Sequence, residues 1–143
     1  MRSLPIAYAL LLSSSLLAAP SAFAGAGEDM ARTRIDHIAK GDVAAVAADY
    51  APEAKLHWIG GPLDGTYAGV EALSALWTKF STAQGAQTAN IASIAEATNP
   101  KGSTITADIA FAGKNTVKIR YVLVYRDGKL ADEIWQVNPN AAY

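Results

Sequence analysis

The chain has 143 residues, of which 12 are basic and 13 are acidic, and it contains no cysteine. The nearly balanced charge, without basic clusters interleaved with aromatic residues, argues against a nucleic-acid-binding protein. Because no disulfide can form, a single hydrophobic core has to stabilise the fold unaided.

The first 24 residues have the pattern of a secretory signal peptide. Arg2 is followed by an apolar run at residues 4–17 and by a small-residue Ala-Phe-Ala end. The run contains three serines and is short for a membrane-spanning helix, although an uncleaved anchor is the alternative. We expect cleavage after Ala24, a periplasmic or secreted protein, and no stable membrane insertion afterwards. The remaining domain, residues 25–143, has 11 basic and 13 acidic residues and thus a net charge of −2.

Two short helices are predicted at the start of this domain. The first covers Glu28 to Lys40, and Gly41 is a typical C-terminal stop. Asp42 then caps the second helix, because its carboxylate can accept from free amides of the first turn. The apolar stripe of the second helix consists of Val43, Val46, Ala47 and Tyr50.

A strand, a glycine-rich loop and a third helix follow. Pro52 cannot continue a helix, and Leu56 to Trp58 are typical of a short strand. The third helix is expected to start at Thr66 or Gly69 and to end at Gly85. Its broad apolar face consists of Val70, Leu73, Leu76, Trp77 and Phe80.

From residue 87 onward the apolar period changes to two, which predicts antiparallel strands. Residues 87–96 have the weakest pattern, and the clearer strands are residues 105–111, 117–125 and 130–137. Asp127-Gly128 is a hairpin signal between the last two strands. The order of elements predicts an α+β fold, with a sheet packed against helices.

Several segments carry a family resemblance: Lys40-Gly41-Asp42, Tyr50 to Ala54, Gly61 to Leu73, and Asp127 to Leu130 followed by Trp135. In this order and spacing they resemble the SnoaL-like branch of the nuclear transport factor 2-like superfamily, over about Gly27 to Asn138. The resemblance implies a cystatin-like cone, in which a curved antiparallel sheet wraps around three helices and leaves an apolar cavity open at one end. It also implies homodimers through the outer sheet face, which would explain the apolar Val122 and Val124.

One activity of related folds is excluded by the same alignment. Ketosteroid isomerases carry a catalytic aspartate at the end of the first strand and a tyrosine donor in the first helix. The corresponding positions here are Trp58 and Arg34, so the base is missing. Such cones host both enzymes and non-enzymes, so catalytic groups have to be sought among other residues.

Glu133 is the first candidate for acid–base chemistry. In a regular strand it shares a face with Trp135, and desolvation there would raise its pKa towards neutrality. Two alternatives remain open: Glu133 is solvated at a sheet edge, or a bulge places Asp132 on the inner face instead.

His57 is the second candidate, since histidine is a natural proton shuttle near neutral pH. Strand alternation turns it away from the face of Trp58, and a lone histidine is often a hydrogen-bonded structural residue. His37 is more typical of a surface position. Two histidines without cysteines or a spaced carboxylate motif predict no metal site. The glycine-rich loop lacks phosphate-binding spacing, and no cofactor is expected.

Aromatic residues are the candidates for lining a cavity: Trp58, Trp77, Tyr121, Tyr125 and Trp135. Such a set is more often simply part of a packed core. A buried tyrosine hydroxyl needs a partner, and a ligand carbonyl could supply one.

Two functions follow from these candidates, besides a purely structural dimerising module. The first is an exported protein that binds a small apolar or aromatic molecule in an enclosed cavity, with Trp135 or Tyr121 in its wall. The alternative is a cofactor-free cyclase, isomerase or hydrolase in which Glu133 or Asp132 works with His57 inside one cavity. If Glu133 carries an isolated desolvated charge, Glu133→Gln should abolish turnover and leave thermal stability equal or higher.

Overall fold

The computed structural model describes residues 25–143, so the predicted signal peptide at residues 1–24 lies outside the described residues. Within residues 25–143 the chain forms three helices and six strands. They are α1 (Ala26–Lys40), α2 (Val43–Ala48), β1 (Tyr50–Ile59), β2 (Gly65–Ala68), α3 (Val70–Gln84), β3 (Thr88–Asn99), β4 (Gly102–Ala112), β5 (Thr116–Arg126) and β6 (Lys129–Val137).

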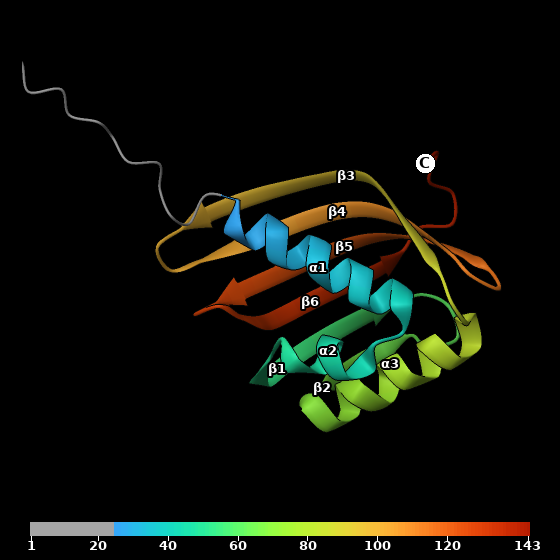
Figure 1. The fold of residues 1–143 in the computed structure, drawn as a ribbon, viewed down its shortest axis with the longest axis horizontal. Coiled ribbons are helices and arrows are strands. Elements are labelled where there is room, and N and C mark those ends of the chain that lie inside the picture. Colours follow the sequence, from blue (N-terminus) through green and yellow to red (C-terminus); the bar gives the residue numbers. More distant parts are fainter. Residues whose placement is uncertain (1–24) are drawn as a thin grey trace, which may run out of the picture.

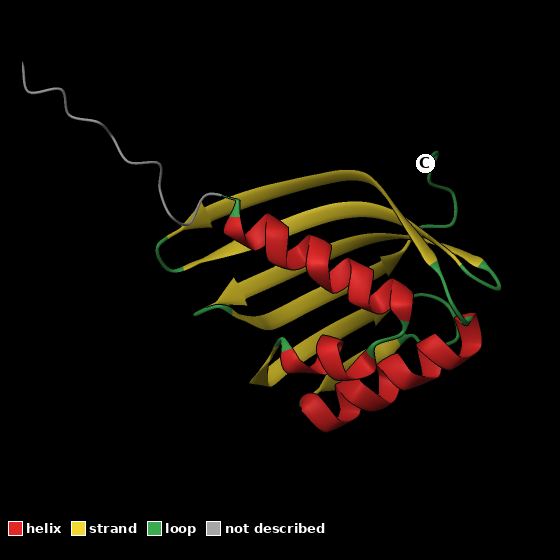
Figure 2. Cartoon of the chain, viewed as in Figure 1, coloured by secondary structure: helices red, strands yellow, loops and turns green. Residues whose placement is uncertain are grey.

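The strands form one curved sheet in the order β2-β1-β6-β5-β4-β3. Neighbouring strands are antiparallel except β1 and β6, which run parallel, whereas the sequence predicted antiparallel pairing throughout. Figures 1 and 2 show the helices on the concave face, with α1 crossing the long strands and α3 lying near β1 and β2. The α+β class and the curved sheet wrapped around three helices are confirmed.

The helix ends follow local signals. Gly41 adopts a positive φ of 70° at the C-terminal end of α1. The Asp42 carboxylate accepts from the Ala45 amide at 3.1 Å and caps α2. Thr66 lies in β2, and α3 begins at Val70. The prediction that α3 could start at Thr66 was therefore wrong, because residues 65–68 pair with β1 instead.

A substitution of Asp42 tests whether its side chain stabilises the start of α2. We expect Asp42→Ala to lower the free energy of unfolding by about 1 kcal/mol, because an amide of the first turn loses its acceptor. Urea unfolding followed by circular dichroism measures the change. Asp36→Ala is the control: this exposed residue pairs with Lys40 within α1 and should change stability by less than about 0.5 kcal/mol. Equal losses in the two variants would contradict the capping role.

β1 is longer than predicted and starts at Tyr50, which the helical pattern had placed on α2. The Leu130 amide donates to the Asp49 carbonyl at 2.9 Å, and Tyr50 pairs with Leu130 on the neighbouring strand β6. Pro52 is tolerated within β1 because it lies in the irregular stretch between Tyr50 and Lys55, where the ladder with β6 is interrupted.

Aromatic rings fill the interior between the helices and the sheet. Trp135 is fully buried and stacks on Trp58 and on Phe111, with centroid distances of 4.8 and 5.3 Å. Trp77 and Phe80 of α3 meet the Trp135 ring edge-on at 5.2 and 5.4 Å. These are distances of packed rings, so the interior around Trp135 is core rather than the hollow that the resemblance implied.

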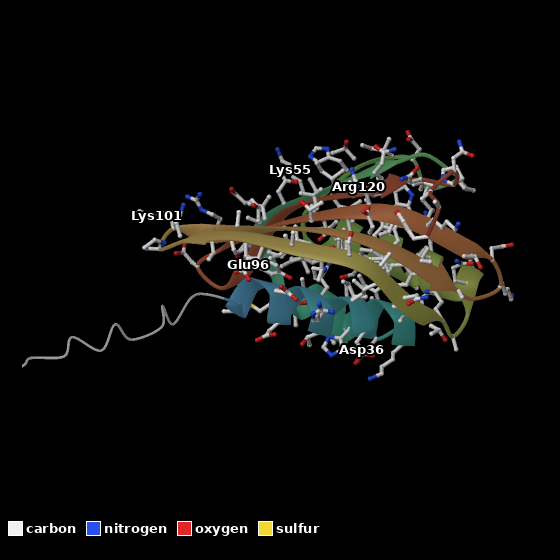
Figure 3. The ribbon with its side chains drawn as sticks, turned by 90° about the horizontal axis from the view of Figure 1, so that it is seen from above. Asp36, Lys55, Glu96, Lys101 and Arg120 are labelled. Carbon is white, nitrogen blue, oxygen red and sulfur yellow. The ribbon has the colours of Figure 1, made fainter. Side chains whose placement is uncertain are left out.

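The outer face of the sheet carries mixed side chains. In Figure 3, Lys55 and Arg120 point away from α1, while Asp36 lies on the far side of that helix. Val122 and Val124 lie half-buried on the outer face, and Ile134 opposite Val122 is 36% exposed. Association into a homodimer through this face stays a prediction.

Candidate functional site

A bulge in β6 decides which face Glu133 occupies. Val124 of β5 pairs with Asp132 and Tyr125 pairs with Leu130, which leaves Ala131 as an extra residue. Leu130 and Glu133 consequently both face inward, and Asp132 faces outward. The bulge that the sequence left open is present, but it places Glu133, and not Asp132, inside the protein.

Arg34 of α1 is the ionic partner of Glu133. Both side chains are fully buried, and Arg34 Nη2 lies 3.1 Å from Glu133 Oε2. The guanidinium also donates from Nε to the Tyr121 hydroxyl at 2.8 Å and from Nη1 to the Val46 carbonyl at 2.8 Å. A second, partly exposed carboxylate, Asp49, accepts from Nη1 at 3.2 Å. The buried guanidinium is thus held by groups from several elements.

Two tyrosines complete the coordination of the Glu133 carboxylate. The hydroxyls of Tyr50 and Tyr121 each donate to Oε1 at 3.1 Å. The indole of Trp77 donates from Nε1 to the Tyr50 hydroxyl at 2.7 Å. We call this set, Arg34, Tyr50, Trp77, Tyr121 and Glu133, the buried ion-pair network. It joins α1, β1, α3, β5 and β6.

Burial shifts the pKa values of the acidic groups in this network. Burial raises the pKa of Glu133, while the Arg34 charge and the two tyrosine hydroxyls oppose that shift. It also raises the pKa of Tyr50 and of Tyr121 well above the ordinary range, so both hydroxyls keep the protons that they donate. The carboxylate is surrounded by protein donors and has no exposed surface. Its geometry suits a structural clamp, because no group of a substrate can reach it.

His57 lies on the opposite face of the sheet from Glu133. Its Nε2 is 3.4 Å from Asp132 Oδ1, and its Nδ1 is 3.4 Å from the Thr66 hydroxyl. The structure therefore brings His57 and Asp132 together, but both side chains are more than 40% exposed on the outer face. Glu133 and His57 are not brought together and cannot serve the same substrate.

The predicted ligand-binding aromatics divide into two groups. Trp77, Tyr121 and Trp135 belong to the core, and Tyr125 is buried with a hydroxyl that has no hydrogen-bond partner within residues 25–143. Trp58 is also buried, and it lines a pocket at one end of the sheet together with Phe80. Of the aromatic residues predicted to line a cavity, Trp58 lines this pocket, whereas Trp135 and Tyr121 do not.

This pocket, the Trp58 pocket, has a volume of about 340 Å³. Its walls come from Trp58 of β1, residues 60–63 of the β1–β2 loop, the last turns of α3, the start of β5 and Val137 of β6. Phe80 supplies the second aromatic wall, with its ring 5.3 Å from that of Trp58. The volume is at the lower end of the range for small-molecule sites, which suits a ligand of one or two rings.

Local hydrogen bonds hold the loop side of the Trp58 pocket. Gly60 and Gly61 have φ angles of 94° and 73°, which only glycine adopts readily. The Asp64 carboxylate accepts from the Gly60 amide at 2.7 Å, and the Tyr67 hydroxyl donates to the Leu63 carbonyl at 2.8 Å. The Asp64 side chain therefore orders its own loop.

The opposite rim is held by Gln84, which the sequence reasoning missed. Its side chain donates from Nε2 to the Asn115 carbonyl at 3.1 Å and accepts from the Asn115 amide at 3.3 Å. Lys79, also missed, is the one charged side chain among the described residues that line the pocket. Arg34 could have been found as an arginine on the buried stripe of α1, between Ala31 and Ile38.

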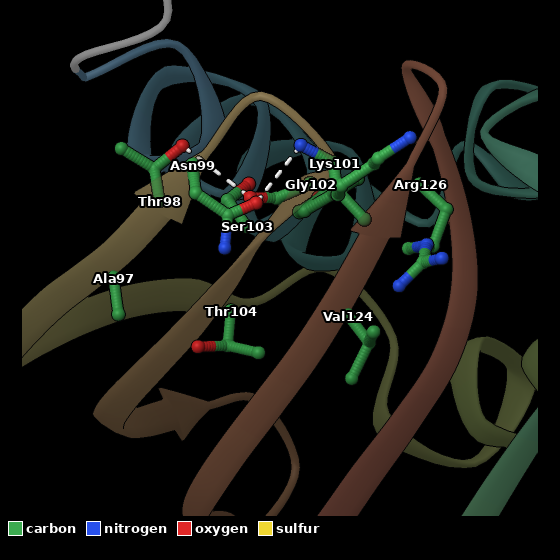
Figure 4. Close-up of a pocket in the computed structure, with 10 residues that line it drawn as sticks. Ala97, Thr98, Asn99, Lys101, Gly102, Ser103, Thr104, Val124 and Arg126 are labelled. Carbon is green, nitrogen blue, oxygen red and sulfur yellow. Dashed lines mark hydrogen bonds between the residues drawn. The ribbon is translucent and has the colours of Figure 1, made fainter.

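A second hollow, of about 270 Å³, lies at the β3–β4 turn (Figure 4). Its polar groups bond to one another, since the Asn99 carboxamide accepts from the Lys101 amide at 2.8 Å and Thr98 donates to the Gly102 carbonyl at 3.5 Å. These bonds shape the turn, and the hollow contains no aromatic wall beyond Tyr125. The Trp58 pocket is the better candidate site.

Two further findings concern residues 25–143 as a whole. No group of three or more histidine, cysteine or acidic side chains there could hold a metal ion. None of the helices in this range is long and apolar enough to cross a bilayer.

No protein-family model matches the sequence, and no curated protein matches it either. Solved structures do match. A protein of unknown function with a cystatin-like fold from Nostoc punctiforme has a TM-score of 0.66 and 16% identity, over 80% of this chain and 90% of the other. An NTF2-like protein of unknown function from Pseudomonas putida has a TM-score of 0.65 and 16% identity, over 84% and 92%. The chain has the cystatin-like, NTF2-like fold.

A third matching structure carries the name of an activity. A proposed polyketide cyclase from Sinorhizobium meliloti has a TM-score of 0.56 and 18% identity, over 76% of this chain and 94% of the other. At such identities the likeness concerns the NTF2-like fold alone, and the function has to be argued from the site.

Proposed function

We propose that this protein is exported and binds a small apolar or aromatic molecule in the Trp58 pocket. The observation that carries the proposal is the pocket itself, a ligand-sized hollow walled by Trp58, Phe80, Val117 and Val137 at one end of the sheet. NTF2-like folds are suited to such a role, since the concave sheet and its helices enclose a site at the open end. Export rests on the predicted signal peptide.

Binding is favoured over catalysis because the acid–base candidates lie away from the pocket. Glu133 is enclosed in the buried ion-pair network, and His57 and Asp132 face outward on the other side of the sheet. The described residues that line the Trp58 pocket include no histidine and no carboxylate. A general acid or base has to reach the proton that it transfers, and none of these groups does so here.

The test is a titration of residues 25–143 with 2-naphthol, a two-ring probe, followed by isothermal calorimetry and by amide chemical shifts. We expect binding with the largest shifts at Gly60, Gly61 and Ala83. Ala83→Trp should reduce the affinity more than tenfold, because the new ring occupies the pocket. Ala97→Trp, which fills part of the hollow at the β3–β4 turn, is the matched control and should bind as the wild type does.

Unchanged affinity in Ala83→Trp would place the probe elsewhere and overturn the assignment of the site. Loss of binding in both variants would show that the added tryptophans act through the fold, and circular dichroism of each variant separates these cases.

A further inference from the structure

The Trp58 pocket has one charged group at its rim, and this group lacks a partner. Lys79 lies on α3 beside Phe80, and within residues 25–143 it forms neither an ion pair nor a side-chain hydrogen bond. Two other surface cations are neutralised, since Lys40 pairs with Asp36 and Arg120 pairs with Asp108. Lys101 forms no ion pair among the described residues either, but it lies at the β3–β4 turn, and Lys79 is the unpaired cation that lines the Trp58 pocket. The ammonium of Lys79 is therefore free to pair with a group brought by the ligand.

A second polar residue, Asn115, lines the same pocket. The backbone N–H and C=O of Asn115 are both bonded to Gln84, while its side-chain amide has no partner within residues 25–143. The pocket thus combines an apolar interior with an ammonium and an amide, both exposed at its edge. No carboxylate among the described lining residues competes for Lys79.

We propose that the ligand is an amphipathic carboxylate, with an aryl or alkyl body against Trp58 and Phe80 and its carboxylate paired with Lys79. This inference rests on the proposed function and names the ligand class of the same pocket. A single lysine is a point charge that suits one carboxylate, whereas phosphate sites favour several donors or an arginine fork. The pocket also adjoins the C-terminal end of α3, whose negative dipole opposes any bound anion and opposes a doubly charged group more than a single carboxylate.

The experiment compares two probes that share a ring system and differ in charge: 2-naphthoate and 2-naphthalenemethanol. Calorimetric titrations of residues 25–143 should show naphthoate binding about three- to fivefold more tightly, a modest preference because an exposed ion pair contributes little. In 0.5 M NaCl the preference should shrink, since salt screens exposed charges.

Two variants assign the preference to a residue. Lys79→Gln should remove this preference, which is measured as the ratio of the affinities for the two probes. Lys101→Gln, at the other end of the molecule on the β3–β4 turn, should retain the full preference.

The outcomes distinguish a failure of the carboxylate assignment from a failure of the proposed function. Equal affinities of the wild type for both probes, or a preference that survives Lys79→Gln, would overturn the carboxylate assignment and leave the proposed apolar binding intact. Binding of neither probe would overturn the proposed function, and this inference with it.

Discussion

Replacing Glu133 by glutamine is expected to lower the free energy of unfolding by about 3–5 kcal/mol. The change leaves the guanidinium of Arg34 fully buried without its closest buried anion, which lies 3.1 Å away. This reverses the sequence expectation of equal or higher stability, which treated Glu133 as an isolated desolvated charge. Urea unfolding at neutral pH, followed by circular dichroism, measures the loss.

Asp49→Asn is the matched control for this prediction. Asp49 also contacts Arg34, at 3.2 Å, but its side chain is 39% exposed. Removing a partly solvated charge should cost less than about 1 kcal/mol. If the two variants lose equal stability, the buried pair has no special role.

The double variant Arg34→Met, Glu133→Leu distinguishes the effect of removing the whole ion pair from the effect of removing one of its two charges. A buried ion pair replaced by apolar side chains of similar volume is often neutral in stability, because neither charge has to be desolvated. We expect the double variant to be more stable than either Arg34→Met or Glu133→Leu alone. Losses that simply add would contradict direct coupling between the two side chains.

Replacing Trp135 by alanine is the second large effect, with an expected loss of about 3–5 kcal/mol. Trp135 stacks on Trp58 and Phe111 and is fully buried, so its removal leaves a cavity lined by aromatic rings. Ile134→Ala on the exposed side of the same strand is the control, and it should lose less than about 1 kcal/mol.

Binding of added indole provides a second test of the Trp135→Ala variant. An apolar cavity created in a rigid core can bind a matching small molecule, and binding to the folded state raises stability by mass action. We expect indole to raise the unfolding midpoint of Trp135→Ala and to affect Ile134→Ala no more than the wild type. The absence of any such difference would show that the core collapses around the missing ring.

The elements themselves could be predicted because their signals are local. The helical spacing of α3, the period-two alternation of β5, the Asp42 cap and the Asp127-Gly128 turn each depend on residues a few positions apart. The resemblance to a cone also followed from the order of such segments. Such signals can be read from the sequence because they depend on backbone geometry and on the periodicity of side chains within one helix, strand or turn.

The site depended on contacts between distant residues, and only the tertiary structure decided it. Arg34 meets Glu133 across 99 positions, and the bulge at Ala131 determines that Glu133, and not Asp132, faces inward. The Trp58 pocket lies at one end of the sheet, next to the interior that Trp135 fills by stacking on Trp58 and Phe111. Strand register and ring packing are long-range properties, because a shift of one residue reverses every side chain on a strand without changing the local pattern.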